Sequence, residues 1–183
     1  MFSPSPNSKP KPRSFLAPLK RNPAMSKEAF SKHWVTEHAQ VVLPYFLDAC
    51  VESYVQIHGP LSMSSSAPPD SNPNNPIAVL QKEIEAGESD GCFEFIGPPD
   101  TSKATPEPAW KAAYYHDIIV SDELKLLVSE ASEHVKIIEK TGIVTGERNA
   151  IIENGKSKIE TNKDVMSVWE EYKRKGEEES SKI

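Results

Sequence analysis

Two histidines five residues apart, His33 and His38, are the first candidates for chemistry in this sequence. They lie in the segment SKHWVTEHAQ, on either side of Trp34 and Glu37, and the chain of 183 residues holds five histidines in all. A histidine in a half-buried pocket can act as a general acid or base near neutral pH. The same pair can instead bind a metal ion or pack in the core.

An amphipathic helix is predicted to carry both histidines. Ser26 is a typical N-cap, and the helix is expected to run from Lys27 to about Leu43, where Pro44 disturbs it. At about 100° per residue, one face is shared by Phe30, Trp34, Glu37, His38 and Val41. His33 is expected on the flank of this apolar face.

These positions allow more than one interpretation. His38 is either a core histidine bonded to backbone or water, or an acid–base group in a pocket. His33 stands four residues before Glu37 and is expected to form a surface pair with it. On an α-helix the two imidazoles diverge by about 140°, whereas a zinc-binding pair needs a spacing of four. No metal site is predicted.

A second set of candidate residues lies on a predicted strand, VESYVQIH, residues 51–58, which Gly59-Pro60 is expected to end. Alternation places Val51, Val55 and Ile57 on one face. The other face holds Glu52, Tyr54, Gln56 and His58. If the apolar face packs beneath helices, the polar face lines a cavity; otherwise it faces solvent.

The remaining pattern completes an α+β domain. Further strands are predicted at residues 14–21, 91–96 and 143–153, the last with a bulge at Gly146. Helices are predicted at residues 77–86, 106–117, 124–139 and 164–173. The segment YYHDIIV, residues 114–120, is ambiguous because aromatic and β-branched residues also favour strands. Phe93 is a cavity wall or core residue, and Tyr114 either packs in the core or reaches the cavity.

The order of these elements predicts a ferredoxin-like βαββαβ sandwich with extra helices and loop insertions. The domain is expected at 14–155, after a disordered leader at 1–13. Residues 61–76 form a loop rich in Ser, Pro and Asn that is either disordered or a lid. Residues 156–183 are expected to form a C-terminal helix and a charged tail. Pairing of two sheets through their open faces predicts a homodimer.

Composition argues against several classes of protein. The formal net charge of −6 gives no basic field for nucleic acid, and no apolar run approaches a membrane span. The two isolated cysteines, Cys50 and Cys92, predict a reduced, cytoplasmic protein. The sequence has no GxGxxG or P-loop for a nucleotide cofactor, and Ser62–Ser66 have no nucleophile-elbow context. No cofactor is expected.

Three parts of this pattern resemble the EthD family of dimeric α+β barrels. They are the turn Arg21–Ser26, the helix with Phe30–His38 (FSKHWVTEH) and the strand Tyr54–His58 (YVQIH). The later Ser121-Asp122-Glu123 is also similar to a family segment, although Leu126 departs from the aromatic residue often found after it. The resemblance covers roughly residues 14–152 and is more specific in the first half.

The resemblance implies an α+β barrel formed by a homodimer, and the proline-rich insertions look like those of a fungal branch that serves aromatic polyketide pathways. The implied activity is cofactor-independent decarboxylation of an aromatic polyketide acid in secondary-metabolite biosynthesis. His38, His58 and Tyr54 would supply acid–base and polarising groups. The substrate would be bound by Trp34, His33, Gln56, Phe93 and Tyr114.

Three alternatives stay open beside this lyase. The same enolate chemistry would serve a polyketide cyclase or dehydratase. A non-catalytic dimeric protein that binds a small molecule would also need an apolar pocket. A haem or oxygen-using enzyme would employ His38 or His58 as an axial ligand.

Overall fold

The computed structural model describes residues 12–64, 74–99 and 106–181. Its centre is one antiparallel sheet in the order β1-β3-β2-β4-β5. The strands are β1 (Arg13–Leu19), β2 (Ser53–Met63), β3 (Gly91–Gly97), β4 (Val144–Glu153) and β5 (Lys156–Ser157). The predicted α+β class is therefore confirmed, and the four long strands are the predicted ones. Residues 1–11 of the leader predicted at 1–13, and much of the loop 61–76, lie outside the described residues.

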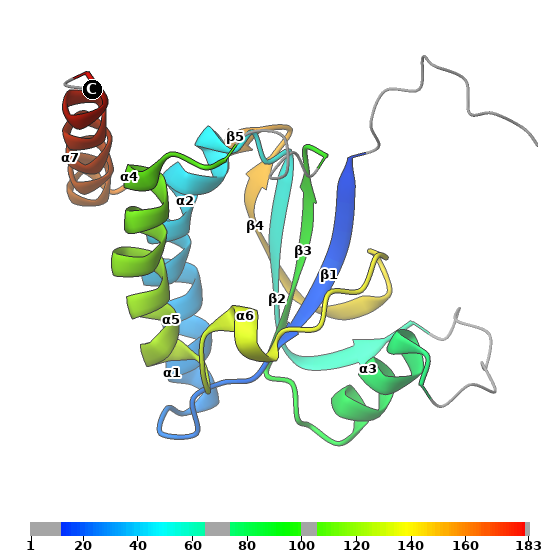
Figure 1. Cartoon of the computed structure of the whole chain (residues 1–183). Coiled ribbons are helices and arrows are strands. Elements are labelled where there is room, and N and C mark those ends of the chain that lie inside the picture. The colour runs from blue at the N-terminus through cyan, green and yellow to red at the C-terminus, as the bar shows by residue number, and fades with distance from the viewer. Residues whose placement is uncertain (1–11, 65–73, 100–105, 182–183) are drawn as a thin grey trace, which may run out of the picture.

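Helices cover one face of this sheet. Figure 1 shows α1, α2, α4 and α5 stacked along that side, with α7 outermost and α3 away from this layer. The first helical run is α1 (Lys27–His33), the π-helical segment η1 (Trp34–His38) and α2 (Ala39–Asp48). The second is α4 (Ala109–Tyr114), the π-helical segment η2 (Tyr115–Val120) and α5 (Ser121–Leu126). The others are α3 (Pro76–Glu85), α6 (Ala131–His134) and α7 (Lys163–Ser180).

The first helical run begins as predicted but continues beyond Pro44. The Ser26 side chain accepts a hydrogen bond from the Ala29 amide, as an N-cap should. The last turn, after Pro44, is held by tertiary packing, because the Phe46 ring lies edge-on to Tyr54 at 5.0 Å and to Phe95 at 5.6 Å. Packing of this kind outweighs the hydrogen bond that a proline removes.

The second helical run resolves the ambiguity at residues 114–120 in favour of helix. The helix predicted at 124–139 is wrong beyond Leu126, because the chain there turns extended and pairs with β1. Ile138 exchanges two backbone hydrogen bonds of 2.9 Å with Leu16, and the Val128 amide donates to the Lys20 carbonyl. Only the short α6 interrupts this segment. The apolar residues of this segment have helical spacing, but its backbone pairs with β1 and is therefore extended.

β2 continues through Gly59-Pro60 instead of ending there. His58 pairs with Glu147 and Ser62 with Thr145, so three β2 residues stand opposite Gly146 alone. An irregularity is present at Gly146 as predicted, but the extra residues lie in β2 and not in the last strand, β4. A side chain at Gly146 would lie 2.4 Å from the His58 carbonyl oxygen, so glycine is required by this close approach.

The two faces of β2 bury different groups. Tyr54, Gln56 and His58 point toward the helical layer and are 3%, 0% and 1% exposed. Ile57 points the other way and packs in a cluster with Leu16, Leu80, Ile84, Cys92 and Ile138. The polar face of β2 thus lies beneath the helices, although the apolar face was the one considered for that position.

The C-terminal helix is longer than predicted and closes the helical layer. α7 reaches Ser180, so most of the predicted charged tail is helical. Trp169 is 4% exposed and meets Trp110 at 5.0 Å and Tyr114 at 4.8 Å between ring centroids. Among the described residues, no helix is both long and apolar enough to cross a bilayer.

Gly91 allows a test of the contact between the sheet and α1. A Cβ at Gly91 would lie 2.6 Å from Trp34 Cζ3, and Trp34 is held by the rings of Phe30 and His58 at 5.5 and 4.6 Å. We expect Gly91→Ala to lower the free energy of unfolding by about 1–3 kcal/mol, as overpacking does. Urea denaturation measures this, and an unchanged free energy would contradict the packing described.

Candidate active site

A cavity of about 340 Å³ lies between the helical layer and the sheet. Its walls are largely aromatic and aliphatic and include Phe15, Phe46, Phe93, Phe95, Tyr115 and Ile119. The polar side chains that line it include Arg13, His38, Tyr54 and Glu123. An apolar cavity with a few polar groups is the usual form of a small-molecule site.

The structure brings half of the predicted site residues to this cavity. Trp34, His38, Tyr54 and Phe93 line it. Four others do not, namely His33, Gln56, His58 and Tyr114. The Tyr114 hydroxyl donates to the Val41 carbonyl at 2.9 Å, and its ring packs on Trp169, so it belongs to the core between helices.

Asp122 binds both histidines of the first helical run. Its carboxylate oxygens lie 2.9 Å from His33 Nε2 and 2.9 Å from His38 Nδ1. His33 therefore pairs with Asp122, and the pair with Glu37 expected from the sequence is wrong. The π-helical segment explains how both imidazoles reach one carboxylate. Its hydrogen bonds join residues five apart, so His33 and His38 come to one side, whereas α-helical geometry separates them.

The carboxylate fixes the orientation and tautomer of His38. An ionised carboxylate only accepts hydrogen bonds, so His38 Nδ1 carries the proton that it donates to Asp122. Nε2 is then the ring nitrogen of His38 that remains available to a molecule in the cavity. Burial would raise the pKa of Asp122, but the hydrogen bonds and charges of His38 and His33 outweigh it and lower that pKa. Asp122 thus stays an anion that accepts the hydrogen bond from His38 Nδ1.

Glu123, the next residue, has the opposite behaviour. It lines the cavity, and its Oε2 accepts a 3.0 Å hydrogen bond from the Ala131 amide. Burial is the largest influence on this carboxyl and raises its pKa, against the lowering effects of that hydrogen bond and of His38. A carboxyl group of this kind can hold a proton for transfer or for a hydrogen bond.

Tyr54 supplies a hydroxyl group in the same cavity. Burial raises its pKa to about 12, although hydrogen bonds with the side chains of Gln56 and Trp34 lower it in part. The phenol stays protonated at neutral pH and can donate to a substrate oxygen. Its ring is held edge-on by Phe46.

His58 occupies a separate position. Its Nδ1 lies 2.6 Å from Ser31 Oγ, and its Nε2 lies 3.1 Å from Gln56 Oε1. Both nitrogens thus have partners from α1 and β2, and burial lowers the pKa of the imidazole. A catalytic role of His58 in the aromatic-walled cavity stays a prediction that this placement does not favour.

Sequence reasoning gave no chemical role to Asp122 or Glu123. The signal available was the Ser121-Asp122-Glu123 segment of the family resemblance, but adjacent acidic residues usually lie on a solvated surface. In the described part of the chain, no group of three or more His, Cys, Asp or Glu side chains is placed to hold a metal ion.

The comparison with known families agrees with the sequence resemblance. Residues 22–129, more than half of the chain, match the EthD domain. This range includes both histidines, Tyr54 and the acidic pair. No curated protein and no solved structure gives a significant match.

The raised pKa of Glu123 predicts a pH-dependent effect on stability. Because the pKa of Glu123 in the folded protein lies above its ordinary value of 4.5, the ionised carboxylate costs stability at high pH, and this cost vanishes as the pH falls below 4.5. Glu123→Gln keeps an acceptor for the Ala131 amide. We therefore expect the variant to be more stable than the wild type at pH 8, with a smaller difference at pH 4.

Urea denaturation at both pH values measures this difference. Glu133→Gln on the exposed side of α6 changes the net charge equally and serves as the control. A Glu123→Gln difference that is the same at pH 8 and pH 4 would contradict the raised pKa.

Proposed function

The chain belongs to the EthD family, and from that premise we propose that it is a cofactor-independent lyase that decarboxylates an aromatic polyketide acid. The observation that carries the proposal is the His38–Asp122 pair facing an aromatic-walled cavity together with Tyr54 and Glu123. We further propose a fungal secondary-metabolite pathway as its setting. The homodimer and the cytoplasmic location implied earlier stay predictions.

The proposed reaction breaks the bond between the carboxylate and the adjacent carbon. Its electron pair moves into a neighbouring carbonyl or ring, forms an enolate and releases carbon dioxide. Tyr54 donates a hydrogen bond to the enolate oxygen, where charge develops. Protonated His38 then delivers the proton from Nε2 to the carbon, and Asp122 stabilises the imidazolium before that transfer.

The remaining cavity groups fit an acidic aromatic substrate. Phe15, Phe93 and Phe95 offer faces and edges for a planar ring system, with Phe15 and Phe95 stacked at 4.9 Å. Arg13 is exposed at one end of β1 and lines the cavity, so its cation can attract the carboxylate. The raised pKa of Glu123 favours its acid form, in which it is a second donor for a substrate oxygen.

His38 is the residue whose loss tests the proposal most directly. We expect His38→Gln to lower kcat for carbon dioxide release by about 10²–10⁴-fold, the usual contribution of a general acid. The purified protein is incubated with a panel of aromatic polyketide carboxylic acids, and carbon dioxide and product mass are measured. His33→Gln is the matched control, because it removes the other imidazole on Asp122 but no cavity wall, and we expect a smaller loss.

Each outcome of this experiment discriminates between functions. Full activity of His38→Gln would refute the acid–base role. Ring closure or loss of water without carbon dioxide would favour a cyclase or dehydratase. Binding that quenches Trp34 fluorescence, with no product from any acid in the panel, would favour a non-catalytic binding protein.

Tyr54→Phe separates the hydroxyl from the ring. The variant keeps the packing on Phe46 and Phe93 and removes the proposed donor to the enolate oxygen, together with the hydrogen bonds of that hydroxyl with Gln56 and Trp34. We expect kcat to fall by about 10²-fold, as for loss of one such donor, with little change in KM. Steady-state kinetics measure both, and a rise in KM at constant kcat would assign Tyr54 to substrate binding alone.

A further inference from the structure

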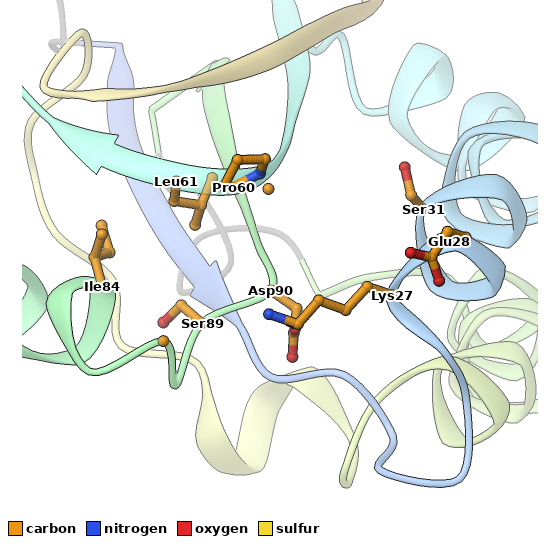
Figure 2. Close-up of a pocket in the computed structure, with 10 residues that line it drawn as sticks. Lys27, Glu28, Ser31, Pro60, Leu61, Ile84, Ser89 and Asp90 are labelled. Atoms are coloured by element: carbon orange, nitrogen blue, oxygen red, sulfur yellow. Dashed lines mark ion pairs between the residues drawn. The ribbon is translucent and has the colours of Figure 1, made fainter.

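A second pocket, of about 280 Å³, lies beside α1 and shares no lining residue with the aromatic-walled cavity. Figure 2 shows Ser31 and Glu28 of α1 across the pocket from Pro60, Leu61 and Ile84. The β2 bulge, the end of α3 and the loop before β3 form these other walls. The pocket is therefore lined by residues that the proposed decarboxylation does not use.

Ser31 connects this pocket to the buried His58. The Ser31 Oγ lines the pocket and lies 2.6 Å from His58 Nδ1. His58 is 1% exposed and is held from its other side by Gln56 Oε1 at 3.1 Å and by the Trp34 ring at 4.6 Å. A hydroxyl, an imidazole and a third orienting group in hydrogen-bonded sequence form the arrangement that activates a serine nucleophile.

The direction of each proton follows from the outer partners. Gln56 Nε2 donates to the Trp34 carbonyl at 3.0 Å, so the amide oxygen of Gln56 must face His58. An amide oxygen only accepts, hence His58 Nε2 carries the hydrogen. Burial lowers the pKa of His58 and favours the neutral ring. Its Nδ1 is then unprotonated and accepts the hydrogen bond from Ser31.

From this geometry we propose that Ser31 and His58 form a second catalytic site, in which Ser31 is the nucleophile of acyl transfer from a small carboxylic ester. Pro60, Leu61 and Ile84 offer an apolar wall for the acyl group. Lys27, four residues before Ser31 on the same helix face, lies in the pocket wall with its side chain 70% exposed. Its ammonium lies 3.7 Å from Asp90 Oδ1 and would have to leave this exposed ion pair to approach an oxyanion.

The covalent steps balance without a cofactor. Ser31 Oγ attacks the ester carbonyl carbon while its proton moves to His58 Nδ1, and the carbonyl oxygen becomes an oxyanion. Collapse of this intermediate breaks the bond to the alkoxide, which leaves with the proton from His58. Water, with His58 again as base, releases the acid and restores Ser31. The sum is ester and water giving acid and alcohol.

Two features set the expected rate and the choice of test. The Gln56 amide fixes the productive tautomer but carries no negative charge, so it stabilises the imidazolium less than a carboxylate does. Turnover should therefore be slow. The Ser89 hydroxyl, 7% exposed in the same pocket, has no hydrogen-bond partner within the described residues and can donate to a ligand. Covalent capture of the nucleophile is thus a better readout than turnover.

A fluorophosphonate probe tests the proposal on the native full-length chain. The serine oxygen displaces fluoride from phosphorus, and the adduct adds a fixed mass. Trypsin cleaves after Lys27 and Lys32, so Ser31 is the only hydroxyl residue in the peptide EAFSK, Glu28–Lys32. We expect one adduct per chain in this peptide, none in Ser31→Ala and none in urea-unfolded protein.

Ser62→Ala is the matched control, because the Ser62 hydroxyl on β2 bonds to Thr145 at 2.6 Å and has no histidine partner. It should label like the wild type. His58→Gln should label at least 100-fold more slowly, with circular dichroism as the check on folding. The pH profile gives a second readout if that variant fails to fold.

Labelling should fall as His58 becomes protonated, with a midpoint below pH 6.5, although Glu147 on β4 works against this lowering. Lys27, Glu28 and Asp90 are the other charged groups that line the pocket. No adduct, an adduct confined to another peptide, or equal labelling of Ser31→Ala would overturn the proposal. Labelling that does not fall with pH, down to the lowest pH at which circular dichroism shows an intact fold, would remove His58 from it.

Discussion

The carboxylate of Asp122 is the constraint on which the aromatic-walled cavity depends. It joins α5 to the first helical run through residues 84 and 89 positions away in the sequence. Burying an anion is unfavourable unless hydrogen bonds and opposite charge compensate for it, and the two imidazoles provide both. The same bonds fix the distance between the helical runs and turn His38 toward the cavity. Fold and site therefore depend on one interaction.

The π-helical segments make that interaction possible. Each helical run is widened in its middle, at Trp34–His38 and Tyr115–Val120, and both segments contribute residues to the cavity. Such segments cost hydrogen-bond quality and are found mostly at functional sites. On an α-helix, one of the two histidines would point away from Asp122. The local irregularity is thus the reason that a five-residue spacing works.

Sequence periodicity predicted the elements that local patterns determine. It failed for the segments whose structure depends on contacts distant in the sequence. The apolar face with Phe30 and Trp34 correctly identified buried positions, and the β2 alternation identified two faces but not that the polar one lies beneath the helices. The helical spacing after Leu124 failed because Ile138 pairs with Leu16, more than a hundred residues away. His38 and Tyr54 were predictable cavity residues. Asp122 and Glu123 were not, because two adjacent acidic residues become buried only when α5 packs against η1.

The adjacent acidic residues Asp122 and Glu123 differ in the direction in which their surroundings shift the pKa. Asp122 is turned toward two imidazoles, which keep it ionised, whereas Glu123 is turned toward an apolar cavity, which favours its protonated form. Two carboxyl groups one residue apart thus have pKa values shifted in opposite directions by their surroundings alone. Asp122 holds the His38 imidazole by a hydrogen bond, and Glu123 can donate to a substrate oxygen when it is protonated. An enolate-forming reaction needs both a proton source and a donor to oxygen, so this division favours catalysis over passive binding.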